Sequence, residues 1–227
     1  SSQKDELNLK SRKLDAKQNE YNLTKSMVDN LEGFPESIRF LKKNASWAKQ
    51  VPLFSDVLFC KEEYRIAIEN YLEPVMNHYV VETQDDAVQA IKLLSDSGKG
   101  RANFFIPPSP LKGEHIQNQL SLSGAEGLIR ALDIIEVDDK YRPLCEMLLH
   151  NVYLLRSDQE NELEKPLANE EMVILSPSGK FTKFKSGMSG GSVGLFEGKR
   201  IGRAKSLENL IKEIKALEIS INKIKST

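Results

Sequence analysis

The sequence of 227 residues predicts an α/β (α+β) domain of two related subdomains, flanked by helices that pair as an antiparallel two-helix coiled coil. Three observations support this prediction. Both ends of the chain are charged and carry apolar residues at heptad spacing, as in coiled coils. Between them short strands alternate with helices, and one strand–turn–helix segment occurs twice. We place the four segments at residues 1–32, 33–110, 111–202 and 203–227.

The first arm, residues 1–32, carries two apolar stripes. The first recurs every seven residues, at Leu7, Leu14, Tyr21 and Val28. The second has the same period but is offset by two, at Leu9, Ala16 and Leu23. A regular coiled-coil seam is offset by three or four, so we expect an irregular seam in this arm. Gly33 and Pro35 then end the helix.

The last arm, residues 203–227, has a regular seam. Its apolar residues step alternately by three and four, at Leu207, Leu210, Ile214, Leu217, Ile221 and Ile224. Each arm taken alone could be a surface helix packed on a domain. Two arms of similar length and pattern instead indicate that they pair with each other, which requires the chain to fold back between them. We expect both to be parts of a longer coiled coil.

The region between the arms contains an internal similarity. Residues 56–65 resemble residues 133–142 at a constant offset of 77. In each copy a short apolar strand leads through an acidic turn to a Tyr-Arg pair that opens a helix. Helices are predicted at 66–72 and 143–149, and strands follow at 79–81 and 153–155. The matches are few, so chance remains an alternative, but we favour a duplication that gave two α/β halves.

Other predicted elements are a helix at 85–94 and strands at 101–106 and 171–175. Ser97-Gly98-Lys99-Gly100 lacks the first glycine and the Ser/Thr of a P-loop, so we interpret it as a helix stop. Pro107, Pro108 and Pro110 end the strand before them.

Composition excludes several classes of function. The net charge is −1, so the chain as a whole offers no electrostatic attraction for nucleic acid. The two cysteines, Cys60 and Cys145, form no CxxC motif, which argues against zinc and against a disulfide scaffold. The histidines His78, His115 and His150 share no ligand spacing, and no nucleophile is placed beside a base. No run is apolar enough to span a membrane, and a reducing, cytoplasmic compartment is the simplest expectation.

Glycine is concentrated in one stretch. Seven of the thirteen glycines lie between residues 179 and 202: Gly179, Gly187, Gly190, Gly191, Gly194, Gly198 and Gly202. A flexible loop is one explanation, and close approach of another backbone is the other. We favour close approach at Gly187, Gly190 and Gly191, because they lie beside a predicted strand whose edge could accept a partner strand.

The same stretch is basic. Residues 176–205 contain one acid and seven basic residues, a local charge of +6: Lys180, Lys183, Lys185, Lys199, Arg200, Arg203 and Lys205. Clustered lysine and arginine attract phosphate through counterion release, so we predict nucleic-acid contact here. The alternative is a solvated surface that keeps the domain soluble.

These residues resemble the hinge domain of bacterial SMC (structural maintenance of chromosomes) proteins over about residues 30–205. The resemblance rests on residues 64–69, 79–82, 87–91 and 100–105, and on a glycine motif. The family pattern is Gly, six residues, Gly, three residues, Gly-Gly. Gly179 and Gly190-Gly191 match it, whereas the middle position is Ser186, with Gly187 beside it.

The resemblance implies a non-catalytic hinge that forms a homodimer, contacts DNA and joins its own two coiled-coil arms. It implies a dimer interface at Gly179, Phe181, Phe184, Gly187, Gly190 and Gly191, and DNA contact by the seven basic residues named above. It also implies a chromosome segregation and condensation protein, nucleoid-associated and not in a membrane, that binds ATP through heads lying outside this segment. We expect no cofactor in this chain.

Three alternatives are weighed against this interpretation. A metal-dependent hook at a coiled-coil apex needs a CxxC from each chain, which is absent here. A small α/β enzyme with helical tails would need a P-loop or a triad. A general protein-interaction module at a coiled-coil apex, without DNA binding, remains open.

Overall fold

A computed structural model of the chain describes residues 2–108, 127–167, 169–192 and 200–227. Contacts divide it into two compact units. The two ends, Ser1–Phe34 and Gly202–Thr227, form the coiled-coil unit, and Pro35–Ile201 forms the central unit. None of the helices in the described ranges has the length and apolar character that a membrane crossing requires.

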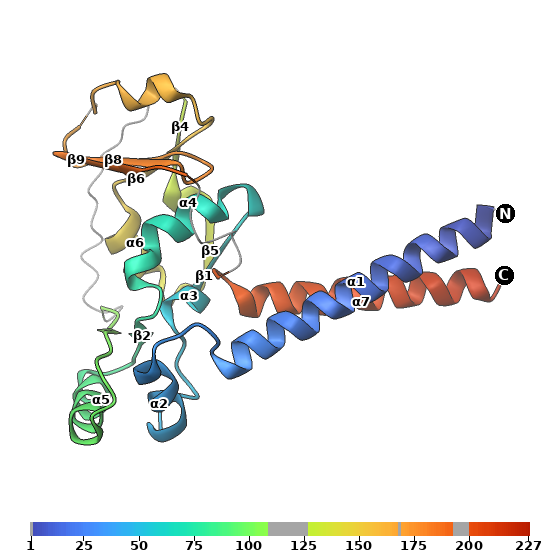
Figure 1. The fold of residues 1–227 in the computed structure, drawn as a ribbon, viewed down its shortest axis with the longest axis horizontal. Helices are drawn as coiled ribbons and strands as arrows, with labels where there is room; N and C mark the ends of the chain where they lie inside the picture. Colours follow the sequence, from blue (N-terminus) through green and yellow to red (C-terminus); the bar gives the residue numbers. More distant parts are fainter. Residues whose placement is uncertain (1, 109–126, 168, 193–199) are drawn as a thin grey trace. The chain divides into compact units, whose positions relative to one another are not determined.

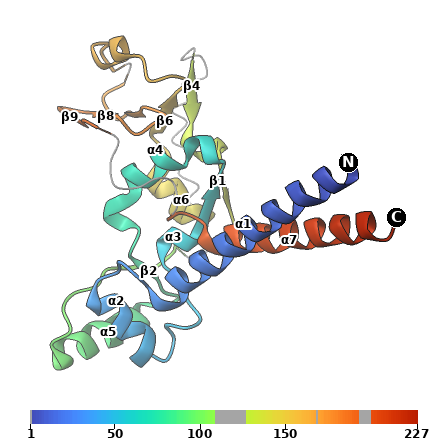
Figure 2. The ribbon, with the colours of Figure 1, turned by 45° about the vertical axis from the view of Figure 1, so that its right-hand side comes forward.

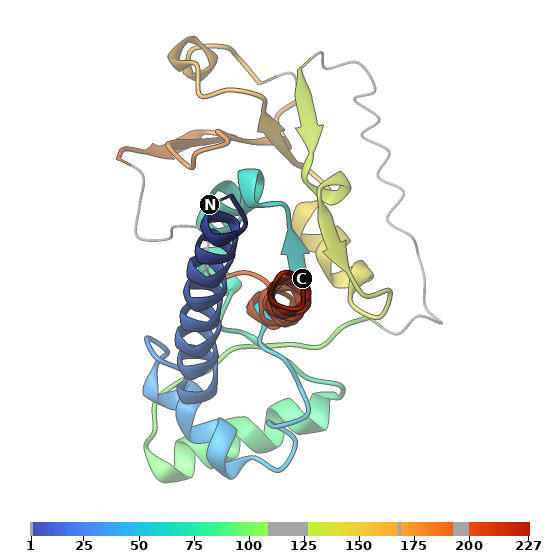
Figure 3. The ribbon, with the colours of Figure 1, turned by 90° about the vertical axis from the view of Figure 1, so that its right-hand side faces the viewer.

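The coiled-coil unit consists of α1 (Ser2–Asn30) and α7 (Arg203–Lys225). Lys17 Nζ lies 3.1 Å from Glu213 Oε2, and Lys10 donates a hydrogen bond to Ser220. Residue numbers therefore fall along one helix as they rise along the other. Figure 3 shows both chain ends at the same end of this pair. The predicted antiparallel two-helix coiled coil is confirmed.

The two stripes of α1 have different surroundings. The first, Leu7 to Val28, is half-buried along its length, whereas Leu9 and Leu23 of the second are 59% and 65% exposed. On α7, Leu210 and Ile221 are each 6% exposed. Because residues seven apart share one face of a helix, the first apolar stripe, and not the second, faces α7.

The first half of the central unit contains helices and one short parallel strand pair. Its elements are α2 (Glu36–Asn44), α3 (Phe54–Val57), β1 (Leu58–Cys60), α4 (Glu62–Leu72), η1 (Glu73–Val75), β2 (Tyr79–Val80), α5 (Gln84–Ser97) and β3 (Phe104–Phe105). The parallel pair is β2 with β3, and α2 and α5 lie side by side near β2 (Figure 1). Thr83 caps α5 by accepting a hydrogen bond from the Asp86 N–H, and Gly98 ends it with φ of 63°. The helix expected at 85–94 is confirmed.

The second half contains a five-stranded sheet in the order β4-β6-β7-β8-β9. Its elements are β4 (Leu128–Arg130), η3 (Ala131–Asp133), β5 (Ile135–Val137), α6 (Arg142–Leu149), β6 (Val152–Leu155), η4 (Glu160–Leu163), β7 (Val173–Leu175), β8 (Phe181–Phe184) and β9 (Gly187–Gly190). Strands β6 and β7 are parallel, and the other neighbours are antiparallel. Figure 2 shows β4 and β9 at the two ends of this sheet.

The strands of the internal repeat pair with each other. β1 and β5 are antiparallel, and Phe59 lies opposite Glu136, its equivalent at the offset of 77. Leu58 lies opposite Val137, which is the equivalent of Cys60, and Cys60 lies opposite Ile135, which is the equivalent of Leu58. This register is that of a local two-fold axis through the Phe59–Glu136 pair. It is the arrangement expected if the halves arose by duplication.

One apolar core joins the two halves of the central unit. It includes Phe54, Leu58 and Ile68 from the first half, and Leu144 and Leu154 from the second. All five side chains are at most 1% exposed. This core therefore connects β6 and β7 of the five-stranded sheet to the repeated strand–helix pairs.

Candidate interface at the edge of the five-stranded sheet

The glycine-rich segment folds as the β8–β9 hairpin, with β9 as the last strand of the sheet. The four residue pairs run from Phe181–Gly190 to Phe184–Gly187, and Lys185 and Ser186 form the loop. Within the described residues, β8 is the only strand paired with β9. The other edge of β9 is therefore open to a further strand.

The hydrogen-bond register defines which backbone groups line this open edge. The Gly191 N–H donates to the Lys180 carbonyl at 2.9 Å, so these opposed residues form a hydrogen-bonded pair. Bonded and non-bonded pairs alternate in antiparallel strands. Phe181–Gly190 and Lys183–Met188 are then the non-bonded pairs, and the N–H and C=O groups of Met188 and Gly190 point away from β8.

Two large apolar side chains are exposed on the hairpin. Met188 is 65% exposed and Phe184 is 43% exposed. They lie on opposite faces of the hairpin, because Met188 shares a face with its partner Lys183, and Phe184 is one residue further on. The free edge is thus bordered by apolar surface on both faces.

Two of the residues expected at the interface serve the central unit itself. Gly179 has φ of 77°, and a Cβ there would lie 2.8 Å from Asn70 Nδ2 and 3.1 Å from Ile66 Cγ2 on α4. Phe181 is 6% exposed, and its N–H donates to Ser176 Oγ at 3.0 Å. Both residues hold β8 against the interior.

Different constraints favour glycine at positions 190 and 191. A Cβ at Gly190 would lie 2.7 Å from the Lys180 carbonyl oxygen and 3.1 Å from Phe181 Cβ. At Gly191 a Cβ would meet nothing within 4 Å, but the φ of 148° disfavours other residues. The backbone that lies close to Gly190 is therefore that of Lys180 in the same chain.

The hairpin loop explains the displaced glycine of the motif. Ser186 has φ of 59°, in the left-handed region that glycine adopts without strain. At Gly187, a Cβ would overlap the ring of Phe184. Position 186 thus has the backbone that a glycine suits, and Gly187 makes room for the aromatic ring.

The basic residues that the structure describes differ in burial and in the unit to which they belong. Lys180 and Lys185 are exposed, and Lys185 forms an ion pair with Glu170 at 3.1 Å. Lys183 is 6% exposed, so its ammonium faces the interior. Arg203 and Lys205 belong to the coiled-coil unit, and Lys199 lies outside the described residues.

Arg200 is anchored inside the central unit. Its guanidinium donates to Asn77 Oδ1 at 2.9 Å, and its main-chain N–H donates to Glu69 Oε1 at 2.6 Å. Glu69 also accepts the Ile201 N–H at 2.7 Å and is 0% exposed. Sequence reasoning missed Glu69, because a glutamate on a charged helix resembles a solvated side chain.

Burial shifts the pKa values of several side chains in the central unit. Burial raises the pKa of the Cys60 and Cys145 thiols to about 12, which keeps both protonated at neutral pH. Burial also lowers the pKa of His78, which favours its neutral form. Across the described ranges, no three His, Cys, Asp or Glu side chains gather as a metal site.

Comparisons with known proteins identify the family. The family model described as "SMC proteins Flexible Hinge Domain" matches residues 48–160. The Chromosome partition protein Smc of Mesomycoplasma hyorhinis is 28% identical over 176 residues, covering 75% of this chain and 18% of that protein. The protein of the same name from Methanocaldococcus jannaschii is 35% identical over 125 residues, covering 52% and 10%. The chain spans less than a fifth of the length of these relatives.

Solved structures show the same fold. The Geobacillus stearothermophilus SMC hinge domain, crystallised as an asymmetric dimer, matches with a TM-score of 0.67 at 23% identity, over 99% of this chain and 93% of that one. The Pyrococcus furiosus Smc hinge domain with an extended coiled coil matches with a TM-score of 0.51 at 19% identity, over 99% and 77%. The chain belongs to the SMC family and carries the flexible hinge domain of a bacterial-type Smc protein.

Proposed function

We propose that this hinge self-associates by adding a partner strand to the open edge of β9, and that it thereby joins two copies of a chromosome partition protein. This proposal rests on the N–H and C=O groups of Met188 and Gly190, which point away from β8. A strand edge of this kind binds through main-chain hydrogen bonds. The dimer named for the Geobacillus stearothermophilus hinge domain supports the same function.

Burial of apolar surface adds to the strand pairing. Met188 and Phe184 border the edge on its two faces, so a partner strand would cover part of both. Such burial contributes about 25 cal/mol per Å². We expect two small contacts of this type, related by a two-fold axis, in each dimer.

Met188→Pro is expected to convert the dimer to a monomer. Proline removes the Met188 N–H, which points to the open edge, and leaves the hydrogen bonds between β8 and β9 in place. The sedimentation coefficient in analytical ultracentrifugation, measured over a concentration series, reports the change.

Met188→Ala is the matched control, since it shortens the side chain and keeps the N–H. It should weaken association less than Met188→Pro does. A Met188→Pro variant that sediments as the wild-type dimer would exclude β9 as the pairing edge.

We also propose that the exposed basic residues beside this edge contact DNA. Lys180 and Lys185 are solvent-exposed on the hairpin, and the Glu170 partner of Lys185 is itself 80% exposed, so this ion pair is weak. Arg203 and Lys205, at the start of α7, are further candidates in the coiled-coil unit. Lys183 is left out because it is buried.

Lys180→Glu together with Lys185→Glu should weaken DNA binding and reduce its dependence on salt. Each phosphate contact adds about 0.9 to the slope of log K against log salt, so the slope should fall by about 1.8. Fluorescence anisotropy with labelled duplex DNA at several salt concentrations measures it. The control pair, Lys43→Glu with Lys92→Glu, carries the same charge change on other exposed helical positions. An equal loss in both pairs would argue against contact at the hairpin.

A further inference from the structure

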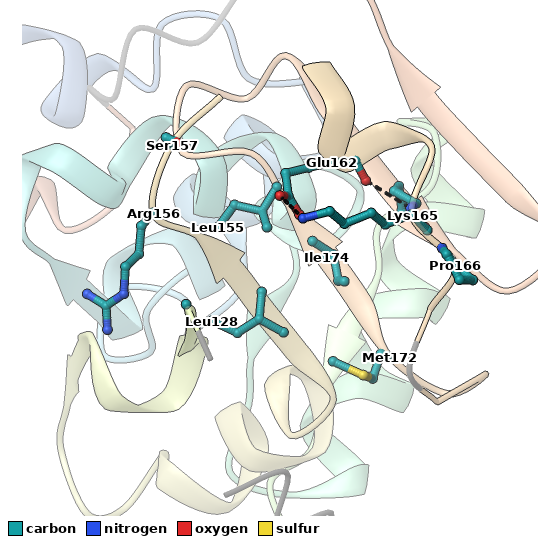
Figure 4. Close-up of a pocket in the computed structure, with 11 residues that line it drawn as sticks. Leu128, Leu155, Arg156, Ser157, Glu162, Lys165, Pro166, Met172 and Ile174 are labelled. Carbon is teal, nitrogen blue, oxygen red and sulfur yellow. Dashed lines mark hydrogen bonds and ion pairs between the residues drawn. The ribbon is translucent and has the colours of Figure 1, made fainter. Parts of the chain in front are cut away.

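A cavity of about 330 Å³ lies on the face of the five-stranded sheet that carries Lys183. Its floor is aliphatic and comes from three neighbouring strands and the residue before β7: Leu128, Leu155, Ile174 and Met172. The turn from Glu162 to Pro166 forms the wall opposite (Figure 4). Leu128 pairs with Leu155, and Tyr153, two residues before Leu155, pairs with Ile174, which in turn pairs with Lys183. Because alternate residues of a strand share a face, the lysine lies on the same face of the sheet as Leu128, Leu155 and Ile174.

Lys183 brings a buried positive charge to this cavity. Its Nζ donates to the main-chain carbonyl of Glu162 at 3.0 Å and to that of Lys165. The Glu162 carboxylate is instead paired with the Lys165 ammonium at 2.5 Å. Within the described parts of the chain, no carboxylate lies within ion-pair distance of Lys183. Carbonyl oxygens satisfy two of its three donors but do not neutralise its charge.

The chemistry of the lining defines the ligand. An ammonium buried without a counter-charge loses its hydration without an ionic partner in exchange, and an anion bound beside it would supply that partner. Phosphate groups are usually held by several donors, such as arginine forks or helix N-termini, whereas Lys183 has one donor left. The lining also includes the polar residues Arg156, Ser157, Glu162 and Lys165, and the Arg156 side chain points away from the Glu162–Pro166 turn that holds the Lys183 ammonium (Figure 4). The floor of Leu128, Leu155, Ile174 and Met172 is aliphatic and suits a short hydrocarbon tail. The volume is at the lower end for small-molecule sites.

We propose that this cavity binds a small amphipathic monocarboxylate, with the Lys183 ammonium as its counter-charge and the aliphatic floor against its tail. The site is independent of self-association at β9. It also gives Lys183 a role that its place in a basic stretch of sequence did not indicate.

Sodium octanoate is the probe, titrated into the wild-type chain and followed through the methyl NMR signals of Ile174 and Met172. We expect saturable shifts, and much weaker shifts with octanol, which has the tail without the carboxylate. Lys183→Met keeps the length and removes the charge, and should weaken octanoate binding at least about tenfold, as expected for the loss of one charge-assisted hydrogen bond. The control Lys180→Met should bind as the wild type does.

A second variant keeps the test decisive if Lys183→Met does not fold. Ile174→Phe fills the floor and leaves the ammonium in place, so it should abolish octanoate binding. The proposal is overturned if the wild type shows no saturable binding, if Lys183→Met or Ile174→Phe binds as the wild type does, or if octanol binds as tightly as octanoate.

Discussion

Replacing Glu69 with alanine is expected to lower the free energy of unfolding of the central unit by about 3 kcal/mol. The Glu69 carboxylate is fully buried and accepts the main-chain N–H groups of Arg200 and Ile201. Alanine leaves both donors without their acceptor, and each unsatisfied buried group costs about 1–3 kcal/mol. Urea denaturation measures the loss, and the fluorescence of Trp47, the single tryptophan of the chain, reports it.

Two further variants separate the hydrogen bonds from the rest of the helix. Glu73→Ala removes an exposed glutamate just after α4 and should change stability by less than about 0.5 kcal/mol. Glu69→Gln keeps one carbonyl oxygen to accept both N–H groups, so it should lose less than Glu69→Ala. Hydrogen exchange at the Arg200 and Ile201 amides should accelerate in Glu69→Ala. Equal stability of Glu69→Ala and Glu73→Ala would contradict this assignment.

The features that sequence predicts well here are periodic and local. The seam of α7 and the stripe from Leu7 to Val28 could be read from their spacing, because side chains seven residues apart share a helix face. The repeated strand and helix could be read from the offset of 77, and the β1–β5 register agrees with it. The antiparallel pairing of the arms followed from these patterns alone.

The surroundings of single side chains could not be predicted in the same way. Phe181 and Phe184 were grouped at one interface, although side chains three apart in a strand point to opposite faces, and only Phe184 is exposed. Lys183 shares the face of Phe181, and its burial depends on the turn at Glu162–Pro166. Glu69 is buried by a contact 131 residues along the chain. Such nonlocal contacts leave no periodic signal.

Gly190→Ala is expected to destabilise the central unit by about 2 kcal/mol and to loosen β9 from β8. An added methyl group would lie 2.7 Å from the Lys180 carbonyl oxygen, which belongs to the backbone and cannot rotate away. Overpacking of this kind typically costs 1–3 kcal/mol. Urea denaturation gives the stability change. Hydrogen exchange at the Gly191 amide, which donates to that carbonyl, reports the loosening of the hairpin.

Measuring the stability of Gly190→Ala at low protein concentration distinguishes two explanations of why position 190 is a glycine. If glycine is required by the chain's own β8, Gly190→Ala should be destabilised even at dilutions where the wild type is monomeric. If glycine is required only by a partner strand, the dilute monomer should keep its stability and only association should weaken. Ser189→Ala, at the neighbouring exposed position of β9, should leave the stability of the monomer unchanged. The contact with Lys180 leads us to expect the first result, so a loss of dimer in Gly190→Ala would follow from damage to the edge strand itself.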